Sequence, residues 1–249
     1  MATSASIFRF KRGDHICVFY HDDAALLQTL CPYLAEGLRN GERCFCAQRQ
    51  DLIPLLLRSL SSYGVNVESE MKRAALEVHS PQDVYLPDSR FRPKALMKLL
   101  ETSIRDARQQ GFTGFRTAGD LSWTANGACD CDQLIAYEQL VQASFSDTAA
   151  VGMCQYRIPD FSSELLERVL ESHQLSLSQT MAQSNHSSLR LRYGKYHTDI
   201  VADRLNPESK FYYVIQRAGA KEILSWGSAA SLEAALTESE GVVNQIQAG

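Results

Sequence analysis

A helix is predicted to begin near Asp22, directly after the apolar run His15–Tyr20, where a nucleotide-binding protein would place its phosphate loop. Such a loop needs glycines, so that backbone amides can wrap the phosphate, and a lysine to neutralise it. The connection here is Tyr20-His21-Asp22-Asp23, which has neither, and its two carboxylates would repel phosphate. The unit has the layout of a nucleotide site without its chemistry, which favours binding or sensing over hydrolysis.

The candidate binding residues come from the ends of predicted strands. In an open parallel sheet, ligands bind in the crevice beyond the carboxyl ends of the strands. Three such ends carry aromatic rings with a few polar groups, a combination that suits a small, mostly apolar molecule with one polar handle. The residues assigned to this ligand site are Tyr20, His21, Asp120, Trp123, Tyr156 and Arg157, with His15 at the start of the first strand.

Two of these residues have further interpretations. Asp120 occupies the position where an ATPase of related layout keeps a magnesium-binding or catalytic carboxylate. Without a phosphate loop it has no triphosphate to serve, and we expect it to cap the following turn or to bond a ligand hydroxyl. His15 could bind the ligand or titrate near neutral pH. The sequence leaves open that Trp123 and the tyrosines only pack under loops and that His15 bonds a backbone carbonyl.

Metal-binding and catalytic motifs are absent from the sequence. Cys44 and Cys46 are two residues apart, as are Cys129 and Cys131, whereas zinc sites usually space such pairs as C-x₂₋₄-C. Buried thiols that act as small hydrophobes explain Cys44 and Cys46. The chain has no G-x-S-x-G, H-E-x-x-H or G-x-G-x-x-G motif. We therefore assign no catalytic residue, no metal ligand and no cofactor, and an enzyme is disfavoured.

The composition is that of an ordinary globular protein and restricts the partners. Of 249 residues, 45% are hydrophobic and 22% charged, and the net charge is −4 without a long basic run, which argues against direct nucleic-acid binding. No apolar run approaches the roughly 20 residues that span a bilayer, and the N-terminus lacks the apolar core of a signal peptide. Seven scattered cysteines suggest reduced thiols. We expect a cytoplasmic protein without a membrane partner.

Strand-like and helix-like segments alternate along the first two thirds of the chain. Helices of ten or more residues between short apolar strands imply parallel pairing, so we predict a three-layer α/β domain with a mostly parallel sheet. The predicted strands are residues 15–20, 43–47, 76–79, 112–118 and 149–156. We divide the chain into an α/β domain at 1–177, a polar linker or arm at 178–210, and a small β-hairpin plus helix at 211–249.

Several stretches resemble the MEDS family, the methanogen/methylotroph sensory domain found in a repressor of dichloromethane dehalogenation. They are His15–Tyr20, Tyr33–Cys44, Gly114–Trp123, Tyr137-Glu138 and Cys154–Tyr156. The resemblance covers roughly residues 10–177. The family is similar to RecA and circadian-clock ATPase domains that have lost the phosphate loop. The resemblance implies a domain that senses small organic molecules and is often fused to DNA-binding or kinase modules, neither of which is visible in this chain.

Three hypotheses follow. The first is a non-catalytic cytoplasmic sensory domain that binds a small, mostly apolar organic molecule at the strand ends and signals to a kinase, a transcription regulator or a second copy in a homodimer, through Phe211, Tyr213 and Trp226. The second is a RecA-like nucleotide binder or weak ATPase with a non-standard loop. The third is a ligand-free assembly protein that uses the C-terminal hairpin. Calorimetric titration with ATP and magnesium separates the first two, and the mass in solution after deletion of 211–249 tests the third.

Overall fold

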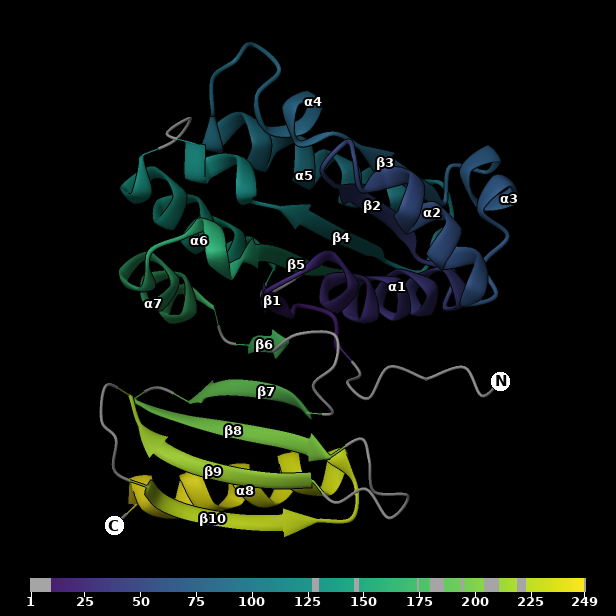
Figure 1. Ribbon diagram of the computed structural model, residues 1–249. Coiled ribbons are helices and arrows are strands. Elements are labelled where there is room, and N and C mark those ends of the chain that lie inside the picture. Colours follow the sequence, from purple (N-terminus) through teal and green to yellow (C-terminus); the bar gives the residue numbers. More distant parts are fainter. Residues whose placement is uncertain are drawn as a thin grey trace.

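The computed structural model describes residues 10–126, 130–145, 148–173, 175–179, 186–193, 195–203, 211–218 and 223–248. Six strands lie in a parallel array, namely β1 (His15–Tyr20), β2 (Arg43–Ala47), β3 (Leu76–His79), β4 (Phe115–Asp120), β5 (Ala150–Arg157) and β6 (Leu175–Gln179). Four antiparallel strands continue the sheet, namely β7 (His186–Tyr193), β8 (Tyr196–Asp203), β9 (Phe211–Arg217) and β10 (Ile223–Ala229). The order across this ten-stranded sheet is β10-β9-β8-β7-β6-β1-β5-β4-β2-β3 (Figure 1).

Helices cover both faces of the parallel part, which confirms the three-layer α/β prediction (Figure 1). One face packs against α1 (Asp23–Arg39) and α2 (Ile53–Ser62), with α3 (Val67–Lys72) beside them. The other face packs against α4 (Pro81–Tyr85), α5 (Pro93–Gln109), α6 (Cys131–Phe145) and α7 (Ser163–Ser172). Two short 3₁₀ turns, η1 (Ser122–Asn126) and η2 (Ile158–Asp160), follow β4 and β5. Of the helices described, none is both long and apolar enough to cross a bilayer.

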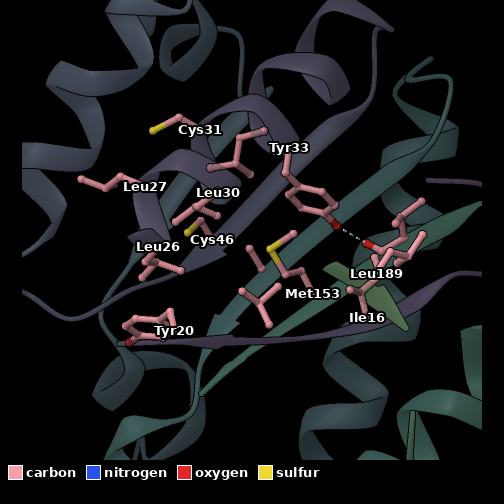
Figure 2. Close-up of a cluster of buried hydrophobic side chains, with 14 of the residues drawn as sticks. Ile16, Tyr20, Leu26, Leu27, Leu30, Cys31, Tyr33, Cys46, Met153 and Leu189 are labelled. Carbon is pink, nitrogen blue, oxygen red and sulfur yellow. Dashed lines mark hydrogen bonds between the residues drawn. The ribbon is translucent and has the colours of Figure 1, made fainter. Parts of the chain in front are cut away.

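The core on the α1 face is built from two sequence periods. Leu26 and Leu30 of α1, one helical turn apart, belong to the same buried cluster as Ile16 and Met153 of the adjacent strands β1 and β5, and Figure 2 draws these side chains. The helix begins as predicted, because the side chain of Asp22 accepts a hydrogen bond of 2.8 Å from the backbone N–H of Ala25. It continues through Pro32 to Arg39 as one element. The cap at Asp22 fixes where the helix begins, just beyond the carboxyl end of β1.

The sequence predicts a polar linker or arm at 178–210, and the part of it that the structure describes contains two strands. Strands β7 and β8 lie in this segment and pair with each other and with their neighbours. Their side chains alternate, with Leu189, Tyr196 and Ile200 buried and Arg190 and Asp199 on the opposite face. A sheet covered on one face only is half polar by composition, which explains why these strands read as a linker. The division of the chain into domains stays a prediction.

The C-terminal hairpin and helix are confirmed as β9, β10 and α8 (Leu232–Ala248), but the proposed contact surface needs correction. Tyr213 is buried, and its ring lies so close to Gly227 that a Cβ there would approach the hydroxyl to 2.3 Å. Phe211 is only partly exposed, whereas 73% of Trp226 is exposed. Binding of a partner or a second copy at Trp226 stays a prediction. Deletion of 211–249 would also strip the pairing edge of β8, so it tests assembly poorly.

Candidate functional site

A polar cleft lies at the carboxyl ends of β2, β4 and β5, where the sequence predicted a ligand. Its volume is about 490 Å³, and Arg49, Asp120, Ser122, Trp123 and Asp160 are among the residues that line it. Most of these groups are charged or hydrogen-bonding. The location agrees with the strand-end rule, but the lining does not suit a mostly apolar molecule.

Asp120 is buried at the end of β4 and caps the following turn, as predicted. Its Oδ1 accepts hydrogen bonds from the Ser122 backbone N–H at 3.0 Å and from the Ser122 hydroxyl at 2.7 Å. Its Oδ2 is buried without a hydrogen-bond partner in the described part of the chain. Burial raises the pKa of Asp120, and the bonds from Ser122 offset this only in part. The Tyr20 hydroxyl lies 3.5 Å from the Ser122 hydroxyl, so Tyr20 borders the same turn.

Replacing Asp120 by asparagine is expected to raise the free energy of unfolding at neutral pH, and the gain should shrink as the pH falls towards 3.8, the ordinary value for aspartate. Because its pKa is raised on folding, the unfolded chain releases this proton first as the pH rises, so ionisation lowers native stability above that value. Asparagine keeps an acceptor for Ser122 without a charge to desolvate. Urea unfolding at several pH values measures the effect, and a variant less stable than the natural chain at neutral pH would contradict it.

The start of α1 is occupied by side chains where a nucleotide site would bind phosphate. Asp22 caps the helix, and Asp23 forms an ion pair of 2.5 Å with Arg49. Arg157, at the end of β5, is paired instead with Asp160 at 2.7 Å. His21 is partly exposed beside these acids. Both nearby guanidinium groups are therefore already neutralised, which weighs against nucleotide binding here.

The seven predicted ligand residues do not form one site. Tyr20, Asp120 and Trp123 border the cleft, and Arg157 reaches it through its ion pair with Asp160. His15 and Tyr156 lie elsewhere. Side chains alternate between the two faces of a strand, and His15 starts β1 on the face opposite to Tyr20, about 17 Å along the strand.

His15 belongs to a buried polar cluster, defined here as His15, Glu138, Cys154 and His173. Their ligand atoms all lie within 4.8 Å of one another between the sheet and helices α6 and α7. Nε2 of His15 is 3.2 Å from Oε2 of Glu138 and 3.3 Å from Sγ of Cys154. Nε2 of His173 is 3.3 Å from the same Glu138 oxygen. Tyr156 joins the cluster, because its hydroxyl donates a hydrogen bond to Oε1 of Glu138.

The electrostatics of this polar cluster follow from burial and mutual contact. Burial, and then the neighbouring His173, lower the pKa of His15 to about 4. Burial opposes the charge of Glu138, but contact with His173 and His15 outweighs it and lowers the pKa of this carboxyl. Burial likewise opposes the charge of His173, but Cys17 and Glu138 outweigh it and raise its pKa. Burial raises the pKa of Cys154.

Glu138, Cys154 and His173 were not assigned from the sequence. They come from α6, β5 and the end of α7, so no local spacing connects them. One signal was available: Cys154 and Tyr156 are two residues apart on a strand and therefore share a face. The pairing of Cys17 with Cys154 in adjacent parallel strands then puts His15 near the same face.

A second cavity, small and apolar, lies against the sheet face covered by α4, α5 and α6. Its volume is about 40 Å³. Its lining includes Phe45, Tyr85, Leu96, Leu100, Phe115, Tyr137, Val141 and Phe145, with His15 and Cys154 at one side. Burial raises the pKa of both tyrosines well above the usual value, so their hydroxyls stay neutral. Together with Ser103 and Thr117 they add hydroxyl groups to a mostly apolar lining.

Aromatic packing places Trp123 between the cleft and this cavity. The ring of Tyr85 stacks on Trp123 at 5.3 Å between centroids, and Phe91 contacts both Trp123 and Tyr137 edge-on, at 5.1 and 5.5 Å. Trp123 lines the cleft while Tyr85 lines the cavity. The stack therefore separates a polar outer cleft from an apolar inner cavity.

Comparison with known proteins supports the family resemblance. The family model of the "MEthanogen/methylotroph, DcmR Sensory domain" matches residues 14–174. The transcriptional repressor DcmR of Methylorubrum extorquens is 25% identical over 166 residues, which are 65% of this chain. The chain spans 58% of the length of that repressor.

Two solved structures are similar to this chain over most of their length. The flagellar accessory protein FlaH of Methanocaldococcus jannaschii is 11% identical, with 88% of this chain and 91% of that protein covered and a TM-score of 0.49. A KaiC-like protein of Pyrococcus horikoshii is 10% identical, with 88% of this chain and 85% of that protein covered and a TM-score of 0.48.

The family match spans most of the α/β part, including β1, the turn after β4, and β5. The chain therefore belongs to the MEDS family of sensory domains.

Proposed function

We propose that this sensory domain binds a small apolar organic molecule in the cavity beneath α5 and α6, rather than in the cleft at the strand ends. The observation that carries the proposal is the lining, which is mostly aromatic and aliphatic. Its polar groups are the hydroxyls of Ser103, Thr117, Tyr85 and Tyr137 and the side containing His15 and Cys154. Ligand sites for small molecules combine such apolar walls with a few polar groups. The polar cleft does not offer this combination.

The size of the cavity sets the size of the ligand. One water-sized group needs about 10–15 Å³ of this kind of volume, so 40 Å³ holds roughly three. A short halogenated alkane or alcohol is of this size. At a ceiling of about −1.5 kcal/mol per non-hydrogen atom, three atoms give at most about −4.5 kcal/mol, a Kd near 0.5 mM. Binding should therefore be sought at millimolar concentrations.

The position of the cavity supports a regulatory role. A molecule there touches α4, α5 and α6 together with the sheet. A ligand that fits one arrangement of these helices better than another shifts the population towards it, which is what a sensor transmits to its output. The similar protein DcmR is a transcriptional repressor, which supports an output through a protein that controls transcription. No step of this mechanism needs catalysis.

Filling the cavity is expected to abolish ligand binding. In Val141→Phe the added ring occupies space next to Tyr137, because Val141 is buried in the lining. Leu140→Phe is the matched control, since Leu140 is the adjacent residue of α6 and is 42% exposed. The readout is Trp123 fluorescence in a Trp226→Phe background, which leaves one tryptophan of the two. Dichloromethane and short alcohols are the probes.

The natural chain and Leu140→Phe should show saturable changes at millimolar ligand, and Val141→Phe should show none. Circular dichroism and urea unfolding establish that both variants are folded. Equal binding by the two phenylalanine variants would place the ligand outside the cavity. Loss of binding in Asp120→Asn, with binding kept in Val141→Phe, would return the ligand to the strand-end cleft.

A further inference from the structure

The polar cluster has the dimensions of a four-coordinate metal site. Zinc–nitrogen and zinc–oxygen bonds are about 2.0–2.2 Å and zinc–sulfur bonds about 2.3 Å, so tetrahedral ligand atoms lie roughly 3.3–3.7 Å apart. Oε2 of Glu138 lies 3.2 Å from Nε2 of His15 and 3.3 Å from Nε2 of His173, and Nε2 of His15 lies 3.3 Å from Sγ of Cys154, all close to these values. All four ligand atoms lie within 4.8 Å of one another. Small movements would place them around one ion.

The ring of His173 is oriented as in a metal ligand. Its Nδ1 lies 2.8 Å from the carbonyl oxygen of Val169, which can only accept, so Nδ1 carries a hydrogen. In the neutral ring, Nε2 then presents its lone pair to Glu138 and the rest of the cluster. Metal-binding histidines almost always donate the other ring N–H in this way. Nε2 of His173 and Oε2 of Glu138 are buried and have no hydrogen-bond partner in the part of the chain that the structure describes.

A hydrogen bond also orients the carboxylate of Glu138. Oε1 of Glu138 accepts a hydrogen bond from Tyr156, so its other oxygen, Oε2, is the one directed at His15 and His173. Hydrogen bonds that fix a ligating carboxylate are a recurrent outer layer of metal sites. Tyr156 would therefore be a positioning residue rather than a ligand.

We propose that His15, Glu138, Cys154 and His173 bind one divalent transition-metal ion, with zinc the best match. Two imidazoles, one carboxylate and one thiolate are all established zinc ligands, and this mixture does not suit calcium or magnesium. Charge also balances, because a carboxylate and a thiolate neutralise a divalent cation. An electrically neutral site is what a fully buried location requires.

Without a metal ion, the charged groups of the polar cluster are buried at a cost. Glu138 and a protonated His173 would then form a buried ion pair whose facing atoms are 3.3 Å apart. Burying such a pair without good hydrogen bonds is costly. A bound ion would offset this cost.

The proposed metal site is reachable from the surface, and a bound ion would link two helices to the sheet. An opening of about 340 Å³ between α7 and strands β7 and β8 reaches His173. The four ligands belong to β1, α6, β5 and the end of α7, so a bound ion would tie both helices to the sheet (Figure 1). Glu138 on α6 is next to Tyr137, which lines the apolar cavity. Metal occupancy would thus fix one wall of that cavity.

Cobalt substitution tests the site on the full chain. The purified protein is stripped with a chelator and titrated with Co²⁺, and zinc content is measured separately after reconstitution. We expect one ion per chain, visible absorption of a four-coordinate cobalt site, and a near-ultraviolet thiolate-to-cobalt charge-transfer band. Cys154→Ala should lose that band. Tyr156→Phe should keep it but bind about 10–100-fold more weakly, as expected for an outer-layer partner.

Two cysteine variants serve as controls. Cys46→Ala removes another buried thiol, on the opposite face of the sheet, and Cys131→Ala removes an exposed one. Both should keep the charge-transfer band. The proposal is overturned if the natural chain binds no stoichiometric Co²⁺ or Zn²⁺, which needs no variant to fold. It is also overturned if the band survives Cys154→Ala or disappears in a control. Ligand binding in the cavity is measured separately, so either idea can fail alone.

Discussion

Replacement of Arg116 by methionine is expected to lower the free energy of unfolding by about 3–5 kcal/mol, the range seen when one partner of a buried ion pair is removed. Arg116 lies in β4 and is 1% exposed. Methionine is of similar length and stays apolar, so packing is largely kept while the charge is lost. Urea unfolding followed by far-ultraviolet circular dichroism measures the change.

The size of the effect comes from what Arg116 leaves behind. Its Nε donates to Glu42 at 2.6 Å, and its Nη1 donates to Glu36 at 3.1 Å and to the Tyr33 carbonyl at 2.8 Å. The guanidinium also lies 4.7 Å from the centre of the Tyr33 ring. Without it, two carboxylates remain with largely buried side chains and no cation between them. Gly37 fits beneath this group, since a Cβ there would lie 2.9 Å from Arg116.

Arg168→Met is the matched control for burial. Arg168 forms an ion pair with Asp132 at 2.6 Å, the same separation as that between Arg116 and Glu42. Its partner is 79% exposed, however, and exposed pairs contribute little. The control should unfold at the same urea concentration as the natural chain. If the two variants lost similar stability, the argument from burial would be wrong.

The example shows how far sequence reasoning reaches. The alternation of apolar strands with helices ending at Gly41, Gly64 and Gly111 gave the parallel α/β layers, because those patterns depend only on local periods. An arginine in the strand 115–120 gives no such signal. Its partners Glu36 and Glu42 are far away in sequence. Glu36 meets it through the packing of α1 on the sheet, and Glu42 through the pairing of β2 with β4.

The candidate sites also differ in how much of them local sequence patterns predict. The strand-end rule located Tyr20, Asp120 and Trp123 at one cleft, because it needs only the direction of each strand. It could not tell which face a residue occupies at the opposite end of a strand, so His15 was grouped with residues that it does not contact. The apolar cavity depends on how three helices pack over the sheet, which no single segment encodes.

The sequence stretch Gly114–Trp123 contains a glycine whose role only the packing reveals. Replacing Gly119 by alanine is expected to destabilise the protein by about 1–3 kcal/mol, the usual range for overpacking a core. A Cβ at this position would lie 1.9 Å from the hydroxyl oxygen of Tyr85. Tyr85 must then leave its place against Trp123, so Trp123 fluorescence should change together with the free energy of unfolding.

A double mutant isolates this contact. In Gly119→Ala with Tyr85→Phe the nearest ring carbon lies 3.2 Å from the new Cβ, a distance that a small shift of the ring relieves. The double mutant should therefore recover most of the stability lost in Gly119→Ala, with a coupling energy of about 0.5–3 kcal/mol.

Gly241→Ala is the control. It lies in α8 with nothing within 4 Å of the added carbon, and it should gain about 0.5–1 kcal/mol. If Gly119→Ala is as stable as the natural chain, or Tyr85→Phe restores nothing, Tyr85 does not occupy the cavity wall as described. Recovery would show that the wall of the apolar cavity depends on the absence of a side chain at Gly119.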